Sequence, residues 1–175
     1  MTQPPRHLEI VDKMDLYLGS DNFYMVSRTA DRQYQAWYAT LLSSVVLLAG
    51  DQEILYAYTD HDPTVKDFRI VVFTTALVFV ADINPHSDGV PIVNATRRSS
   101  LIGMKLSASE RIDTEGRRSY EWPGVLNLVL TYSDLETRVE IVADGVNRYN
   151  VKELSPIVAL LEGLSADLAK DRVGV

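Results

Sequence analysis

Residues 36–59 read AWYATLLSSVVLLAGDQEILYAYT, and the fold depends on the transition within them. Up to Ala49 the apolar residues cover more than one face of a helix, which is typical of a buried helix. Gly50 is well placed just past the C-terminus of that helix. From residue 53 onward the apolar residues alternate and the aromatic content rises, which is typical of a strand. The sequence therefore predicts that helical chain gives way to sheet at residue 50.

Upstream of this transition, an apolar residue occurs every three or four positions between residues 7 and 18, which predicts a short amphipathic helix. The turn-forming residues 19–22 are expected to end it. A second helix is expected to begin near Asp31, after possible caps at Ser27 and Thr29. We therefore expect two helices before the first strand.

Downstream of the transition, the pattern predicts an antiparallel sheet. Residues 68–83 are too long for one typical strand and are expected to form a hairpin divided at residues 74–76. Residues 125–132 and 137–143 form the clearest hairpin pattern of the chain. Two further strands are expected to turn one face to the core, through Ile54, Tyr56 and Tyr58 in residues 53–59, and through Ile102, Met104, Leu106 and Ala108 in residues 101–108.

A closing helix follows the predicted sheet. Ser155 is suited to be its N-cap and Pro156 its first residue, and an apolar stripe extends from there to Leu168. The expected fold class is α+β: a bent antiparallel sheet or partly open barrel, capped by a C-terminal helix and preceded by two N-terminal helices. We expect residues 1–49 to form a helical segment that packs on a main domain of residues 50–175.

The composition narrows the possible functions. The chain has 175 residues, of which 46% are hydrophobic and 23% charged, as in an ordinary globular domain. Cysteine is absent, which excludes disulfides, thiolate metal sites and a cysteine nucleophile. A formal net charge of −7 disfavours binding to nucleic acid or to an anionic membrane. The N-terminus lacks the pattern of an export signal, and the apolar stretch 36–49 is shorter than a membrane span, so a cytoplasmic protein is expected.

The order of these patterns resembles a pleckstrin-homology-like domain of the bacterial type, related in shape to GRAM domains, over residues 50–170. The residues that carry the resemblance are Gly50-Asp51-Gln52-Glu53, Val72-Phe73-Thr74 continuing into Leu77-Val78-Phe79, the strand 101–106 and the closing helix 156–169. The resemblance implies a strongly bent sheet of roughly seven strands, with the last helix over one mouth of the barrel. It also implies a module that binds proteins or lipid headgroups, or that self-associates.

Two departures from the family pattern bear on ligands. The basic residue that often follows the hairpin threonine is missing, because Thr74 is followed by Thr75 and Ala76. The loop after the first strand, where phosphoinositide binders place basic residues, is mainly acidic, which argues against an anionic headgroup. Its charged residues and histidine are Asp60, His61, Asp62, Lys66, Asp67 and Arg69.

The triplet Asp60-His61-Asp62 combines carboxylate and imidazole groups, which serve as general bases and as metal ligands. Consecutive side chains at the end of a strand point to opposite faces, however, and seldom converge on one point. The triplet is therefore either a metal site or an acidic turn before Pro63. No cofactor is expected.

Arginines cluster around the predicted strand 101–108, and arginine suits carboxylate and phosphate ligands. With the neighbouring tryptophan they form a candidate ligand site: Arg97, Arg98, Arg111, Arg117, Arg118 and Trp122. Acidic residues are interleaved with them, as in an ordinary solvated edge: Glu110, Asp113, Glu115 and Glu121.

Together these features predict a non-enzymatic, self-associating and protein-binding module. Phosphate-loop, dinucleotide, serine-hydrolase and zincin motifs are absent from the sequence. The uncharged helical stretch 36–49 and the apolar hairpin 68–83 exceed what one small sheet covers, which favours a homo-oligomer. The alternatives are a small-molecule-binding protein or hydrolase-type enzyme that uses His61 or His86 with nearby carboxylates, and an anion binder that uses the arginines.

Overall fold

The computed structural model describes residues 5–18, 21–59, 67–86, 89–109, 123–144 and 155–171. The chain divides into two compact units, Met1–Ala95 and Thr96–Val175. The boundary lies inside a strand, whereas the sequence pattern predicts a division at residue 50. The three helices that precede the first strand belong to the same unit as the first sheet.

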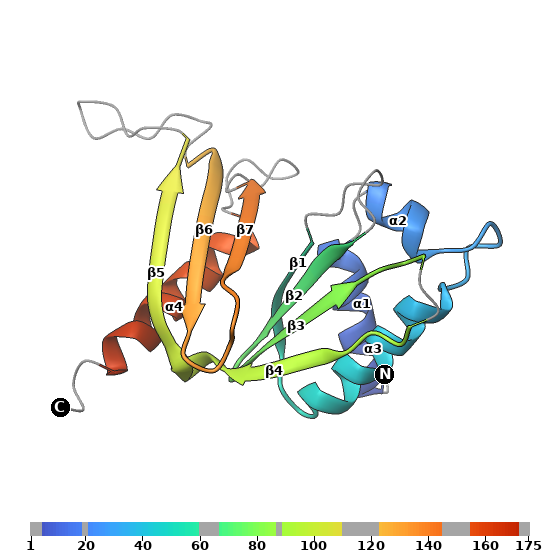
Figure 1. Ribbon diagram of the computed structural model, residues 1–175, viewed down its shortest axis with the longest axis horizontal. Helices are drawn as coiled ribbons and strands as arrows, with labels where there is room; N and C mark the ends of the chain where they lie inside the picture. Colours follow the sequence, from blue (N-terminus) through green and yellow to red (C-terminus); the bar gives the residue numbers. More distant parts are fainter. Residues whose placement is uncertain are drawn as a thin grey trace. The chain divides into compact units, whose positions relative to one another are not determined.

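The first unit combines helices with a four-stranded sheet of order β1-β2-β3-β4 (Figure 1). The strands β1, β2 and β3 pair antiparallel in sequence order. The elements are α1 (Arg6–Leu18), α2 (Asp21–Ser27), α3 (Ala36–Ala49), β1 (Ile54–Thr59), β2 (Phe68–Thr74), β3 (Leu77–Ile83) and β4 (Val93–Arg97), the last of which crosses the unit boundary.

The helices and strands of the first unit share one hydrophobic core. Helix α1 contributes Ile10, Met14 and Leu18, and α3 contributes residues that include Tyr38 and Val45. They pack with residues of β1, β2 and β3 in the same cluster. Burying each such side chain contributes about 1.5–3 kcal/mol before the loss of chain entropy is counted. The N-terminal helices are therefore part of the folded unit.

The N-terminal segment differs from the expectation in two places. The prediction of two helices is wrong, because α2 begins at Asp21, within the stretch expected to be a turn. Helix α3 begins at Ala36 and not near Asp31. A small loop separates α2 from α3, closed by an isolated bridge between Arg28 and Tyr34. The backbone N–H of Gln35 donates to the carbonyl of Ser27 at 2.8 Å. Because this bond closes the loop just before Ala36, the helix begins after it.

Strand β1 does not follow the predicted alternation. Its register with β2 shifts between Ile54 and Tyr56, which marks a bulge or irregularity. The buried residues of the strand are consequently Ile54 and Ala57, while Tyr56 and Tyr58 are half-buried. The expected common face of Ile54, Tyr56 and Tyr58 is wrong, because one displaced residue moves later side chains to the other face.

The hairpin β2–β3 is confirmed, with its turn at Thr75 and Ala76. The Thr74 hydroxyl oxygen accepts a hydrogen bond from the backbone N–H of Leu77 at 2.8 Å. The Gln52 side-chain oxygen accepts one from the backbone N–H of Ala76 at 3.2 Å. Both faces of β2 and β3 carry buried residues. Most apolar side chains of this hairpin are therefore buried in the structure.

The second unit is a three-stranded antiparallel sheet of order β5-β6-β7 with one long helix (Figure 1). The predicted hairpin of residues 125–132 and 137–143 is confirmed as β6 and β7. Helix α4 buries Ile157, Leu160 and Leu164, and it begins at Pro156 as predicted. The elements are η1 (Arg98–Ser100), β5 (Leu101–Ala108), β6 (Val125–Tyr132), β7 (Val139–Asp144) and α4 (Pro156–Asp171).

Of the predicted core face of β5, Met104 is half-buried, whereas Ile102, Leu106 and Ala108 are exposed, so the prediction that this face turns to the core is wrong for most of its residues. Met104 lies opposite Leu130, a buried residue of β6. A register shift between Leu101 and Gly103 turns Leu101 into the core and leaves Ile102 62% exposed. The α+β fold class is confirmed: the described strands form antiparallel sheets, and a C-terminal helix follows them. Among the described residues no helix is long and apolar enough to cross a membrane.

Gly50 ends α3 with φ +54° and ψ −120°, a conformation that residues with a Cβ rarely adopt. An added Cβ would meet no heavy atom within 4 Å, so the cost of Gly50→Ala is backbone strain alone. We expect this variant to lose about 1–3 kcal/mol of unfolding free energy in urea denaturation.

Gly103→Ala is the matched control, because its Cβ would lie at ordinary distance from Thr131, 3.7 Å, and alanine suits a strand interior better than glycine. We expect it to change stability by less than about 1 kcal/mol. Equal effects of the two variants would show that Gly50 is not strained.

Candidate functional site

Helix α3 contains no charged residue along its whole length. Its three serine and threonine hydroxyl groups are also satisfied within the helix, and the Tyr38 hydroxyl donates to Asp15. The Thr40, Ser43 and Ser44 hydroxyls each donate to the backbone carbonyl four residues earlier, at 2.9, 2.9 and 3.0 Å. A partner can therefore cover this helix without leaving a charge or a side-chain hydroxyl unpaired.

Part of α3 is nevertheless exposed. Leu47 has 82% of its surface accessible, and Leu48 is exposed beside it. The opposite side of the helix is buried through Tyr38, Leu41 and Val45. A helix that is apolar on all sides is normally covered on all sides. The composition of α3 is thus that of a buried helix, while the residues that the structure describes cover only one side of it.

An apolar groove runs beside this exposed side, between α1 and α3, with a volume of about 510 Å³. Both helices contribute to its walls, and the exposed Leu47 is one of the lining residues. The lining residues are His7, Val11, Tyr34, Ala39, Leu42, Ser43, Val46 and Leu47. The volume lies in the range of roughly 300–1,000 Å³ that is usual for ligand pockets. We refer to these eight residues as the α1–α3 groove.

Asp15 fixes the segment that supplies Tyr34 to the groove. Its carboxylate accepts hydrogen bonds from the Tyr34 hydroxyl at 2.7 Å and from the Tyr38 hydroxyl at 3.0 Å. Arg28 Nη2 also donates to it at 2.5 Å, and the guanidinium stacks over the Tyr34 ring at 3.6 Å from the centroid. Burial, together with the Asp15 carboxylate, raises the pKa of both tyrosines.

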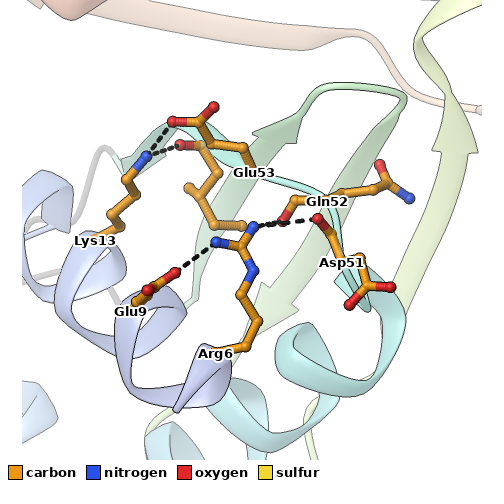
Figure 2. A network of polar contacts seen from close by, with 7 residues as sticks. Arg6, Glu9, Lys13, Asp51, Gln52 and Glu53 are labelled. Carbon is orange, nitrogen blue, oxygen red and sulfur yellow. Dashed lines mark hydrogen bonds and ion pairs between the residues drawn. The ribbon is translucent and has the colours of Figure 1, made fainter. Parts of the chain in front are cut away.

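A second polar network attaches α1 to the chain that leads into β1 (Figure 2). Arg6 donates to the Glu9 carboxylate at 2.7 Å and to the Gln52 carbonyl at 2.7 Å. Lys13 donates to the Glu53 carboxylate at 2.5 Å. The hydrogen bond from Lys13 lowers the pKa of Glu53. These contacts fix α1, one wall of the groove, against the sheet.

Three tyrosines, Tyr38 and Tyr132 buried and Tyr56 half-buried, give the molecule a measurable response to alkali. Burial is the main cause that raises the pKa values of Tyr38, Tyr56 and Tyr132. Their neutral forms stabilise the fold below the pKa of an unfolded tyrosine, about 10, and this contribution is lost as the pH rises further. We expect phenolate absorbance to increase in a cooperative step that coincides with the loss of circular dichroism. Ionisation of these three phenols in a fully folded chain at pH 11 would contradict this.

The predicted metal triplet Asp60-His61-Asp62 lies outside the described residues, as does the candidate histidine His61 of the enzyme alternative. His86, the other one, is exposed in a turn, where its backbone N–H donates to the Asn84 side-chain oxygen at 2.9 Å. Within the described ranges no group of three or more histidine, aspartate or glutamate residues is arranged to hold a metal ion.

Of the predicted ligand site, Arg111, Arg117, Arg118 and Trp122 also lie outside the described residues. Arg97 and Arg98 are described, and their environments differ. Arg97 is exposed. Arg98 is buried, and its guanidinium forms an ion pair with Asp167 of α4 at 2.7 Å. Among the described arginines of that cluster, Arg97 alone presents an exposed side chain.

A smaller cavity of about 310 Å³ lies at the start of α3. It is lined by Gln35, Ala36, Trp37, Thr40, Pro85, Gly89, Val90 and Pro91. Trp37 packs edge to face on Phe23 and Phe68, so its ring belongs to the core as well as to the cavity wall. The α1–α3 groove is larger and more apolar, and it is the better candidate site.

The groove was not predicted from the sequence pattern. The sequence carried part of the signal for it, because the stretch 36–49 is uncharged. The pattern does not show, however, which side of that helix stays exposed. His7 and Val11 read simply as positions on an amphipathic helix. They become groove residues because α1 packs beside α3 in the tertiary structure.

No protein-family model matches the chain, and no curated protein matches it. Among solved structures, the chain is similar to the hSac2 domain from the human phosphoinositide phosphatase Sac2, with 19% identity and a TM-score of 0.38. The match covers 82% of this chain and 87% of that chain. A TM-score of this size does not establish a shared fold.

Proposed function

We propose that the chain is a non-enzymatic binding or assembly module of the cytoplasm, which self-associates and binds protein through its helical surface. A pleckstrin-homology-like shape for residues 50–170 is part of this proposal. In its support, the described part of the chain has seven strands in sequence order, followed by α4. Lipid headgroups are not the proposed ligand, because the chain carries a formal charge of −7.

The observation that carries the proposal is the exposed side of α3. It combines Leu47 and Leu48 with hydroxyls that are already hydrogen-bonded inside the helix. Burying such a surface in a contact stabilises the complex by roughly 25 cal/mol per Å² of apolar area. It also desolvates no charge of α3, because the helix has none. A surface of this kind favours association.

The mass of the full chain in solution tests the proposal. Light scattering coupled to size-exclusion chromatography at micromolar concentration is expected to give a multiple of the 19.6 kDa chain mass. Because the contact is apolar, the mass is expected to persist in high salt, which weakens charge-driven association. A single 19.6 kDa species under both conditions would contradict self-association.

A further inference from the structure

We infer that Asp15, Tyr24 and Tyr34 form a binding site for a guanidinium group. Arg28 of the same chain occupies this site and so closes it to an arginine of a protein partner. The inference rests on the proposed binding of protein, and it names the chemistry of one contact with that partner. It does not depend on self-association.

The contacts of Arg28 are those by which proteins recognise a guanidinium group. Its Nη2 donates to the Asp15 carboxylate at 2.5 Å. Its Cζ atom lies 3.6 Å from the centroid of the Tyr34 ring and 5.7 Å from that of the Tyr24 ring. Aromatic faces and a carboxylate suit the planar, delocalised charge of arginine better than the compact charge of lysine. The site is therefore selective for a guanidinium group.

Contacts that do not involve Arg28 hold the site in shape. The Tyr34 hydroxyl donates to Asp15 Oδ2 at 2.7 Å, and the Tyr38 hydroxyl donates to Oδ1 at 3.0 Å. The rings of Tyr34 and Tyr38 also pack edge to face, with their centroids 5.3 Å apart. The carboxylate and the Tyr34 ring thus keep their places when Arg28 leaves. A site that is ordered in advance binds a ligand more tightly than one that has to be ordered on binding.

A partner's arginine can reach this site and is attracted to it. Tyr24 is 42% exposed, and the side chains of Asp15 and Arg28 are 31% and 18% exposed. The first unit contains twelve aspartate and glutamate residues against six lysine and arginine residues, a formal charge of −6. Such a unit attracts a basic partner. Because a partly exposed ion pair adds little stability, Arg28 can give way to a competing arginine.

Removal of the internal arginine tests the site with a small probe. Arg28→Gln keeps a hydrogen-bond donor near Asp15 and removes the charge. N-acetyl-arginine amide is expected to bind this variant at least about tenfold more tightly than the original chain, in which the site is occupied. N-acetyl-lysine amide has the same charge without the planar group and is expected to bind more weakly. Nuclear magnetic resonance titration of the Tyr24 and Tyr34 ring signals measures both affinities.

Two further variants serve as controls. Arg6→Gln is the matched control, because Arg6 also donates to a carboxylate, that of Glu9, at 2.7 Å. We expect it to bind the arginine probe within about threefold of the original chain, since the site stays occupied. Tyr24→Leu, added to Arg28→Gln, removes one ring and is expected to weaken binding by about two- to fivefold. Circular dichroism confirms that each variant is folded.

The outcomes separate this inference from the proposed self-association. Tighter binding of the arginine probe by Arg28→Gln than by the original chain and by Arg6→Gln supports the inference. Equal affinities in the three proteins, or equal affinities for the arginine and lysine probes, would overturn it. If Arg28→Gln does not fold, Arg28→Lys decides by the same comparison, because lysine keeps the charge and lacks the planar group. No partner enters these titrations, so a failure here leaves the mass measured by light scattering as the test of self-association.

Discussion

Asp167→Ala is expected to destabilise the protein by about 3–5 kcal/mol, the cost of breaking a buried ion pair on one side. The side chains of Arg98 and Asp167 are 8% and 16% exposed. Two nitrogens of the Arg98 guanidinium contact the same carboxylate oxygen, Nε at 2.9 Å and Nη2 at 2.7 Å. Removing the carboxylate leaves a guanidinium that is buried and no longer neutralised by Asp167.

The backbone of α4 shows how closely this arginine is packed. A Cβ added at Gly163 would lie 2.7 Å from Arg98 Nη2, so glycine leaves the space that the guanidinium occupies. Asp167 is one helical turn further along α4. The pair joins η1 to α4 within the second unit, across 69 positions of sequence. Urea denaturation of the full chain, monitored by circular dichroism, measures the loss.

Arg97→Ala is the matched control, because Arg97 is the neighbouring arginine and is exposed. We expect it to change the unfolding free energy by less than about 0.5 kcal/mol. A double replacement, Arg98→Met with Asp167→Leu, is expected to cost less than Asp167→Ala, since it removes both charges together. A loss below about 1 kcal/mol for Asp167→Ala would show that the pair does not hold α4 in place.

Asp15→Ala is expected to cost about 2–4 kcal/mol, because one carboxylate serves three donors. Tyr38 is fully buried, and its hydroxyl would lose its bond to Asp15 Oδ1. Arg28 and Tyr34 would lose their bonds to Oδ2. The loop between α2 and α3 is then no longer fixed to α1 through this carboxylate, and Tyr34 is less well placed at the groove. Thermal unfolding measures the loss.

Asp12→Ala is the control for Asp15→Ala, since Asp12 is an exposed aspartate three residues earlier on the same helix. It is expected to change stability by about 0.5 kcal/mol or less. Asp15→Asn is expected to retain part of the stability, because an amide oxygen still accepts one of the tyrosine hydroxyls. Equal melting temperatures for Asp12→Ala and Asp15→Ala would contradict the role of the carboxylate as a shared acceptor.

Local patterns in the sequence were enough to predict the order of most elements. The period of the apolar residues distinguishes α3 from β1 and marks the hairpins β2–β3 and β6–β7, because helix and strand repeat at different intervals. Proline after serine gives the start of α4. The absence of charge in residues 36–49 indicated a surface that needs to be covered, and this remains the basis of the proposed self-association.

Other features depended on contacts that a local pattern does not contain. The bulges in β1 and β5 shift side chains by one position, so alternation placed Tyr56 and Ile102 on the wrong faces. Backbone hydrogen bonds between the two ends of the loop before α3 close that loop. The helix therefore begins five residues later than expected.

Spacing and composition over a few residues are enough to predict the α+β class, the antiparallel hairpins and the uncharged apolar helix. The ion pair of Arg98 with Asp167 and the groove between α1 and α3 arise from the packing of segments that are distant in the sequence. Burial and ion pairing depend on which distant segments meet. That choice is made by the packing of the whole unit, which a local period does not encode.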